Sequence, residues 1–169
     1  MIRFNKKMVK AIIDIITSEP TKRLPSLQSM RIRRDGFAYI TNGYVAIRYK
    51  FQTEIVPVDP EEDEFIITAK DLLLWYHEAK ASDYLSEISI VDLATKTNNL
   101  EYPDIACLFD QKIKRARGRE SIRFDEKLLN MFCRAAGNTM IEAYPSDICV
   151  YLKSVQKDEQ IEAILMEIR

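Results

Sequence analysis

Apolar residues recur with a helical period near the start of this chain of 169 residues. Met8, Ile12 and Ile16 lie four residues apart with apolar neighbours, which predicts an amphipathic helix over residues 6–18. Asn5 comes directly before this stretch and is a residue type that caps helix N-termini. The pattern therefore predicts a capped helix with one buried face.

The same spacing predicts two further helices. The second covers residues 69–81 and follows Thr68 as its cap, and the third covers residues 125–136 and is ended by Gly137. Short strands precede the three helices at residues 2–4, 65–67 and 121–124. The chain thus repeats the order strand, helix, strands three times.

Tight turns divide the remaining sequence into strands. Asp35-Gly36 and Asn42-Gly43 supply the positive backbone dihedrals of hairpin turns, which separate strands around residues 30–32, 37–40 and 44–49. Later strands are predicted at residues 87–91, near Leu100, and at residues 139–144, 148–152 and 160–168.

The predicted fold class is α+β, with three strand-helix-strand units, antiparallel sheets and helices on one face. We expect residues 1–110 to form a domain of two units and residues 121–169 to form a half-domain. The basic segment 111–120 links them. A length of 169 residues agrees with one large or two small domains.

Composition narrows the class of protein. Hydrophobic residues make up 47% of the chain and charged residues 30%, which excludes wholesale disorder. The longest apolar runs are far shorter than a membrane span, and charges occupy the place where a signal peptide needs an apolar segment. We therefore expect a cytoplasmic protein without membrane partners.

The sequence lacks the motifs that most catalytic and cofactor-binding sites require. With four glycines, neither a Walker loop nor a dinucleotide fingerprint can be formed. Cys107, Cys133 and Cys149 are far apart and are interpreted as small buried hydrophobic residues. His77 is the single histidine and lies on a predicted outer helix face. Trp75 and Tyr76 are assigned to the core. The sequence predicts no enzyme, no metal and no cofactor.

Four segments resemble, in order, motifs of the bacterial-type DNA polymerase III beta sliding clamp family. Lys22 to Gln28 resembles the clamp motif of Arg-Pro followed by Leu, and Ile40-Thr41-Asn42-Gly43-Tyr44 resembles Ala-Thr-Asp-Gly-His. Tyr102-Pro103-Asp104-Ile105 resembles Phe-Pro-Asp-Tyr. The last residues, Ile164-Leu165-Met166-Glu167-Ile168-Arg169, resemble the closing Met-Pro-Met-Arg, with Glu167 in place of Pro.

The resemblance covers the clamp's middle domain and the second half of its last domain. It implies a DNA-clamp-like fold and a non-catalytic platform, with a groove for short peptides from polymerases or repair proteins. The residues that match this groove are Leu27, Thr41, Gly43, Tyr44, Ile164, Met166, Ile168 and Arg169. The alternative is that these residues only pack the terminal strand onto the sheet.

The resemblance also implies weak, sequence-independent binding of double-stranded DNA. The net charge of -1 gives no overall attraction, so only the distribution of basic residues is informative. The candidates are Lys7, Lys10, Lys127 and Arg134 on the predicted helices, and Lys112, Lys114, Arg115, Arg117 and Arg119 in the linker. A linker that only keeps the chain soluble is the alternative for the last five.

Two functions remain open from the sequence. One is a clamp-like replication accessory protein, a processivity factor that binds DNA and peptides and forms a homo-oligomer. The other is a protein-interaction module that binds clamp-seeking peptides without encircling DNA.

Overall fold

The computed structural model describes residues 1–56, 64–96, 102–110, 125–137, 140–145, 149–155 and 161–166. The strands in chain order are β1 (Arg3–Asn5), β2 (Ser29–Arg33), β3 (Phe37–Thr41), β4 (Val45–Lys50), β5 (Glu64–Thr68), β6 (Tyr84–Ser86), β7 (Thr95–Lys96), β8 (Ile141–Pro145), β9 (Cys149–Ser154) and β10 (Ile161–Met166). The α-helices are α1 (Lys6–Ile16), α2 (Ala69–Glu78), α3 (Glu87–Leu93), α4 (Ala106–Asp110) and α5 (Glu126–Ala135). Short 3-10 helices are η1 (Glu19–Arg23), η2 (Pro25–Leu27) and η3 (Thr53–Ile55).

Eight of the strands form one sheet in the order β7-β5-β2-β3-β4-β10-β9-β8, and β1 pairs with β6 in a small second sheet. Every pairing among the described strands is antiparallel. The predicted mixture of helices and antiparallel sheet is therefore confirmed. Because β10 lies beside β4, strands from both sides of the segment 111–120 share one sheet.

The predicted caps set the helix ends. The Asn5 side chain accepts a hydrogen bond from the Met8 amide at 2.9 Å, which starts α1. Thr68 and Asp71 form a capping box at the start of α2. Gly137 follows α5 with a φ of 78°, a conformation that glycine adopts without strain. The second helix ends at Glu78 rather than at residue 81, because Ala79 is already extended.

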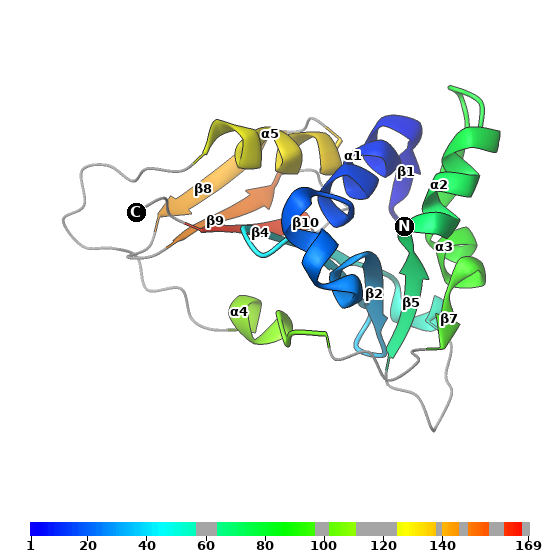
Figure 1. Cartoon of the computed structure of the whole chain (residues 1–169), viewed down its shortest axis with the longest axis horizontal. Coiled ribbons are helices and arrows are strands. Elements are labelled where there is room, and N and C mark those ends of the chain that lie inside the picture. Colours follow the sequence, from blue (N-terminus) through cyan, green and yellow to red (C-terminus); the bar gives the residue numbers. More distant parts are fainter. Residues whose placement is uncertain are drawn as a thin grey trace.

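Helices α5, α1 and α2 lie on one side of the large sheet, and α4 lies on the other side (Figure 1). Helix α1 is placed between α5 and α2 and contacts both. The expectation that helices cover one face holds for these three helices. It misses α4, which covers part of the outer face.

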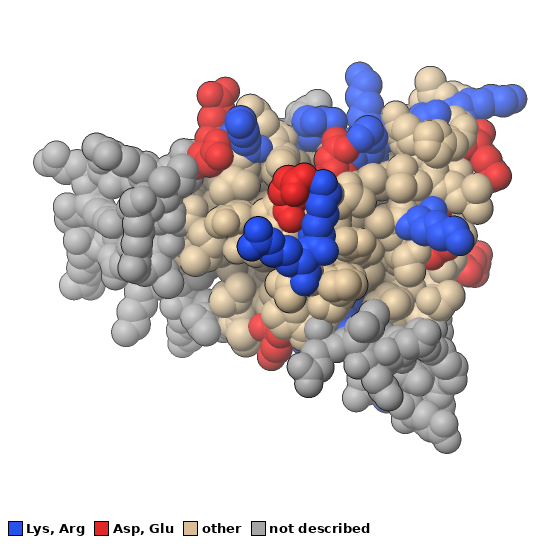
Figure 2. Space-filling view, viewed as in Figure 1, with Lys and Arg blue, Asp and Glu red and all other residues tan. Residues whose placement is uncertain are grey.

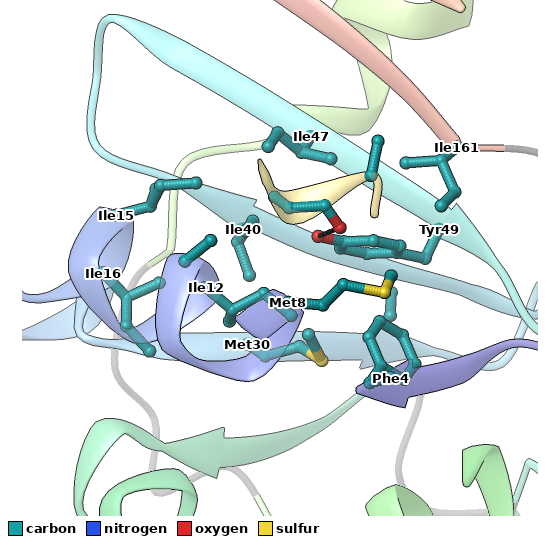
Figure 3. Packing of buried hydrophobic residues seen from close by; sticks show 14 of the residues in the cluster. Phe4, Met8, Ile12, Ile15, Ile16, Met30, Ile40, Ile47, Tyr49 and Ile161 are labelled. Atoms are coloured by element: carbon teal, nitrogen blue, oxygen red, sulfur yellow. Dashed lines mark hydrogen bonds between the residues drawn. The ribbon is translucent and has the colours of Figure 1, made fainter. Parts of the chain in front are cut away.

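The main core fills the space between α1 and the sheet (Figure 3). Met8, Ile12 and Ile16 of α1 belong to one buried cluster with Met30 and Ile40 of the strands, and the Met8 side chain extends between Phe4 and Tyr49. Full burial stabilises each such aliphatic side chain by about 1.5 to 3 kcal/mol relative to exposure. Because side chains alternate between the two faces along each strand, the apolar residues of neighbouring strands together form the sheet face that packs against α1.

One predicted strand is wrong. Residues 87–91 belong to α3, because Ser86 caps a helix there and its hydroxyl accepts a hydrogen bond from the Ser89 amide at 3.1 Å. Glu87 is fully buried, and its carboxylate accepts hydrogen bonds from the amides of Ile2 and Gln52. These partners are distant in sequence, so the alternating apolar pattern alone indicated the wrong element.

Several predictions concern residues outside the described ranges. The strand at residues 121–124 and the strand near Leu100 are among them. The repeat of three complete units and the division into a domain, linker and half-domain therefore stay predictions. Within the described ranges, no helix has the length and apolar character needed to cross a membrane.

The cysteines differ from the expectation that all three are buried. Cys149 is buried and Cys133 is partly buried, but Cys107 is exposed on α4. None of the three forms a disulfide bond. The prediction for Cys107 is wrong because a short helix, absent from the predicted elements, turns this side chain towards solvent.

Candidate binding surfaces on the two faces of the sheet

The turn between β3 and β4 is held by its own side chains. The side-chain oxygen Oδ1 of Asn42 accepts hydrogen bonds from the backbone amides of Tyr44 and Val45, both at 3.0 Å. The Thr41 hydroxyl accepts from the Gly43 amide at 3.0 Å and donates to the Val45 carbonyl at 2.9 Å. Gly43 has a φ of 89° and is exposed. The result is a rigid turn that presents Tyr44, which is 55% exposed.

Strand β10 brings Met166 next to this turn. The Met166 amide donates a hydrogen bond to the Tyr44 carbonyl at 3.0 Å, directly after the pair Leu165 and Val45. Met166 is 41% exposed, so Tyr44 in the turn and Met166 at the end of β10 both present accessible side chains at adjacent backbone positions. Two walls of the predicted peptide groove, the turn and the terminal strand, are therefore adjacent.

Ile164 faces the same side of the sheet but is buried. It packs in an outer apolar cluster with Ala46 and Cys149 and with Ile105 and Phe109 at α4. Ile105 ends the Pro-Asp motif that was compared with the clamp, and α4 follows it directly. Sequence reasoning did not include α4 in the candidate surface. Ile105, just before α4, and residues 106 and 109 within it have the spacing of one helix face. A helix of five residues is too short for this spacing to stand out in the sequence.

The other predicted groove residues are distributed less closely. Leu27 is 3% exposed at the end of η2 and belongs to neither apolar cluster of the described residues. Ile168 and Arg169 lie outside the described ranges. The structure thus brings together Thr41, Gly43, Tyr44 and Met166, with Ile164 buried beneath them.

A polar network continues along the outer face from Ile164. Arg48 of β4 and Glu162 of β10 form an ion pair across paired strands, and the Tyr151 hydroxyl donates to the same carboxylate. The Arg48 guanidinium lies 4.8 Å from the ring centroid of Phe37 and 4.7 Å from that of Phe109. This network fastens the terminal strand and α4 to the first hairpin.

The network changes the pKa values of its members. Burial acts to lower the pKa of Arg48, but the hydrogen bond and charge of Glu162 outweigh it and raise the pKa. Burial, followed by the hydrogen bond to Glu162, raises the pKa of Tyr151. Arg48 therefore stays charged and Tyr151 stays protonated over the physiological pH range.

A small polar pocket lies further along the outer face. It has a volume of about 160 Å³ and is lined by Arg31, Arg33, Tyr39, Glu64 and the segment 102–106. Arg31 forms an ion pair with Glu64, and its guanidinium lies 4.5 Å from the Tyr102 ring centroid. Burial, with the charge of Asp35, raises the pKa of Tyr39 to about 12, and burial raises that of Tyr102. Opposite charges offset each other here, so the pocket favours no net charge in a ligand.

The helix-bearing face carries the predicted basic residues of α1 and α5. Lys10 and Arg134 both pair with Asp14, the second at 3.4 Å, while Lys7 and Lys127 are exposed. In Figure 2 Lys and Arg side chains gather along the upper rim, over α5, α1 and α2, with Asp and Glu among them. The five basic residues of the segment 111–120 lie outside the described ranges.

A larger pocket opens on this face. Its volume is about 530 Å³, and its lining residues are Asn5, Lys6, Lys7, Lys10, Tyr76, Ala81 and Arg134. Three of the predicted DNA-binding residues, Lys7, Lys10 and Arg134, therefore converge on one hollow. Lys6 and Ala81 were not identified as site residues from the sequence. Trp75 and Tyr76 were assigned to the core. Tyr76 does pack partly against the core, but it also reaches this pocket.

Comparison with known proteins extends these observations at the level of fold. No protein-family model matches the sequence, and no curated protein sequence matches it.

No group of three His, Cys, Asp or Glu residues with metal-binding geometry occurs among the described residues.

Solved structures of the Helicobacter pylori beta clamp resemble the chain. The complex with 3,4-difluorobenzamide gives a TM-score of 0.58 at 13% identity, over 99% of this chain and 65% of that chain. The complex with diflunisal gives 0.60 at 12%, over 98% and 64%. The complex with carprofen gives 0.58 at 13%, over 99% and 66%.

The fold is thus beta-clamp-like, and it spans slightly less than two thirds of those clamp chains. The resemblance first seen in four short motifs is supported by the fold. At 12 to 13% identity, this likeness concerns fold alone.

Proposed function

We propose that this chain is a non-catalytic, clamp-like accessory protein of DNA replication. It takes short peptides of polymerases or repair proteins beside Tyr44 and Met166, and it contacts double-stranded DNA without reading sequence. The observation that carries the proposal is the pairing of β10 with β4, which sets the exposed Met166 against the Thr41-to-Tyr44 turn. The beta-clamp-like fold supports the same assignment.

The surface has the chemistry that peptide binding requires. Tyr44 and Met166 supply exposed apolar contact area beside a turn whose backbone is fixed. A Cβ at Gly43 would meet no atom within 4 Å, so a ligand backbone has room to approach there. Because the backbone of this turn is already fixed, the turn itself loses little conformational entropy on binding.

The test is a calorimetric titration with a peptide that carries a Gln and a Leu-Phe pair. We expect micromolar binding, which corresponds to about -8 kcal/mol. Met166→Ala should weaken binding by about 1 to 2 kcal/mol, because most of an apolar contact is lost. Met140→Ala is the matched control, since Met140 is 77% exposed and precedes β8 at the far end of the sheet.

A second control separates binding from stability. Leu129 packs against the main core on the helix-bearing face, so Leu129→Ala should lower the free energy of unfolding without selective loss of peptide affinity. The absence of binding by folded protein would contradict the peptide part of the proposal.

The DNA part has its own test. Binding of labelled duplex should fall with salt, and each phosphate contact should add about 0.9 to the negative slope of log affinity against log salt. Replacing Lys112, Lys114, Arg115, Arg117 and Arg119 by Gln should flatten this slope. An unchanged slope would mean that the linker makes no phosphate contacts.

The second candidate function, a module that binds clamp-seeking peptides without encircling DNA, differs in assembly. A sedimentation measurement of solution mass separates the two, because a monomer of this size cannot encircle DNA. A stable oligomer supports the platform, and a monomer that retains peptide binding supports the module.

A further inference from the structure

The pocket on the helix-bearing face joins three helical regions. Its lining comes from the start of α1, from Tyr76 on α2 with Ala81 beyond it, and from Arg134 on α5. In Figure 1 these helices lie next to each other across one side of the sheet. A volume of about 530 Å³ lies within the ordinary range for small-molecule pockets.

The charges of the pocket are set in place by contacts within the chain. Lys6 donates a hydrogen bond to the Ala79 carbonyl at 2.5 Å, and its ammonium lies 4.8 Å from the Tyr76 ring centroid. Asp14 pairs with both Lys10 and Arg134. Lys7, on the pocket lining, is exposed.

Four cationic side chains therefore line the pocket, while the carboxylate that positions two of them is not among its lining residues. Cations held before a ligand arrives lose little freedom when it binds. The arrangement favours an anionic group with several acceptor oxygens, as phosphate has.

The rest of the lining is less polar. Tyr76 and Ala81, which are also lining residues, contribute an aromatic ring and a methyl group. Aromatic rings are surfaces on which nucleobases stack. A ligand that satisfies both halves of the pocket carries a phosphate and a flat, partly apolar ring.

We propose that this pocket binds one nucleotide, with its phosphate among Lys6, Lys7, Lys10 and Arg134 and its base against Tyr76. The nucleotide is either free or one unit of a nucleic-acid strand. This inference deepens the DNA-binding half of the proposed function, but it makes a separate claim, namely a discrete pocket rather than a diffuse basic face.

The experiment is a calorimetric titration of the full chain with four probes. Thymidine monophosphate and the 5′-phosphorylated tetranucleotide of thymidine should both bind, whereas thymidine and pyrophosphate should each bind at least about tenfold more weakly than the monophosphate. Tighter binding of the tetranucleotide than of the monophosphate assigns the site to strands. Equal binding assigns it to free nucleotides. Pyrophosphate binding equal to that of the monophosphate would overturn the proposal, because the base would then have no role.

Substitutions test the two halves of the pocket. Lys7→Gln should weaken monophosphate binding about fivefold to tenfold, while Lys70→Gln, which removes the same charge from an exposed position outside the pocket, should leave it unchanged. Tyr76→Leu should weaken binding several-fold and Tyr76→Phe should preserve it. Equal effects of Lys7→Gln and Lys70→Gln would indicate general electrostatics and overturn the proposal.

Ala81→Phe fills the pocket from an exposed position without changing charge. It should abolish monophosphate binding, and circular dichroism should confirm that the variant is folded. If Ala81→Phe still binds the monophosphate, the pocket inference fails, while salt-dependent duplex binding can still support the proposed function. If the chain binds the monophosphate but no duplex, the pocket inference stands and the DNA part of the proposed function fails.

Discussion

The two faces of the large sheet are built from the same strands but by different interactions. On β4, Val45, Ile47 and Tyr49 point to the helices and are buried in the main core, while Ala46 and Arg48 point the other way. The helix-bearing side is sealed by aliphatic and aromatic packing. The outer side combines a smaller apolar cluster with the buried ion pair between Arg48 and Glu162.

This difference separates stability from specificity of assembly. Apolar packing is nondirectional, so the core under α1 supplies stability wherever shapes match. A buried ion pair contributes little net stability but strongly disfavours arrangements that leave one charge unpaired. We infer that the outer network fixes which strand lies beside β4, and hence where Met166 is placed.

The largest effect is expected from the helix-bearing side. Phe132 of α5 is fully buried, so Phe132→Ala should reduce the free energy of unfolding by about 3 to 5 kcal/mol. Urea denaturation followed by circular dichroism measures this. Phe132→Leu should cost clearly less, and a loss below that of an ordinary surface substitution would contradict the assigned core.

Breaking the outer network should have the next largest effect. Glu162→Ala leaves Arg48 charged and shielded from solvent, which should cost about 3 kcal/mol of unfolding free energy. The double variant Arg48→Met with Glu162→Leu should lose less than the single variant, because no charge remains buried. Urea denaturation of the two variants decides this, and a double variant that is less stable than the single would contradict the specificity role.

Two glycines offer a matched comparison of local packing. Both Gly43 and Gly137 have positive φ values, 89° and 78°. A Cβ at Gly137 would lie 3.3 Å from the Met8 sulfur, while one at Gly43 would meet nothing within 4 Å. The free energy of unfolding, measured by thermal denaturation, should therefore fall by about 2 kcal/mol in Gly137→Ala and by about 1 kcal/mol in Gly43→Ala. Equal losses would show that packing at Met8 adjusts freely.

The smallest effect at neutral pH is expected from Tyr39→Phe, which should matter only in alkali. The folded state raises the pKa of Tyr39 from 10.0 to about 12, so its stabilising contribution is complete below pH 10 and is lost as the pH rises towards 12. The variant should flatten the fall of urea midpoints between pH 10 and 12. Tyr84→Phe, at a position that is 59% exposed, is the control and should leave the profile unchanged.

Local signals predicted the helix-bearing side well. Asn5, Thr68 and Gly137 act within three residues of the helix ends they define, so their meaning is independent of the rest of the fold. The region around Glu87 was misread because its carboxylate is bound by amides that are 85 and 35 residues away. Such partners leave no periodic signal.

The candidate surfaces show the same limit. The adjacency of Tyr44 and Met166 agrees with the resemblance, because the groove that the resemblance implies contains both segments. The nucleotide pocket could not be predicted, since Lys6, Tyr76 and Arg134 converge only after three helices pack. Predicting it requires the packing angles between helices, which side-chain periodicity does not contain.

The three cysteines differ in exposure, so a thiol-reactive fluorescent dye can label this protein selectively at one position. Thiolates are the reactive species towards maleimides, and burial raises the pKa of the Cys133 thiol, while Cys149 is shielded from solvent. A dye should therefore attach first at Cys107, without any cysteine being engineered. Because α4 lies across the sheet from α1, such a dye would report on ligands of the outer face and leave the nucleotide pocket unlabelled.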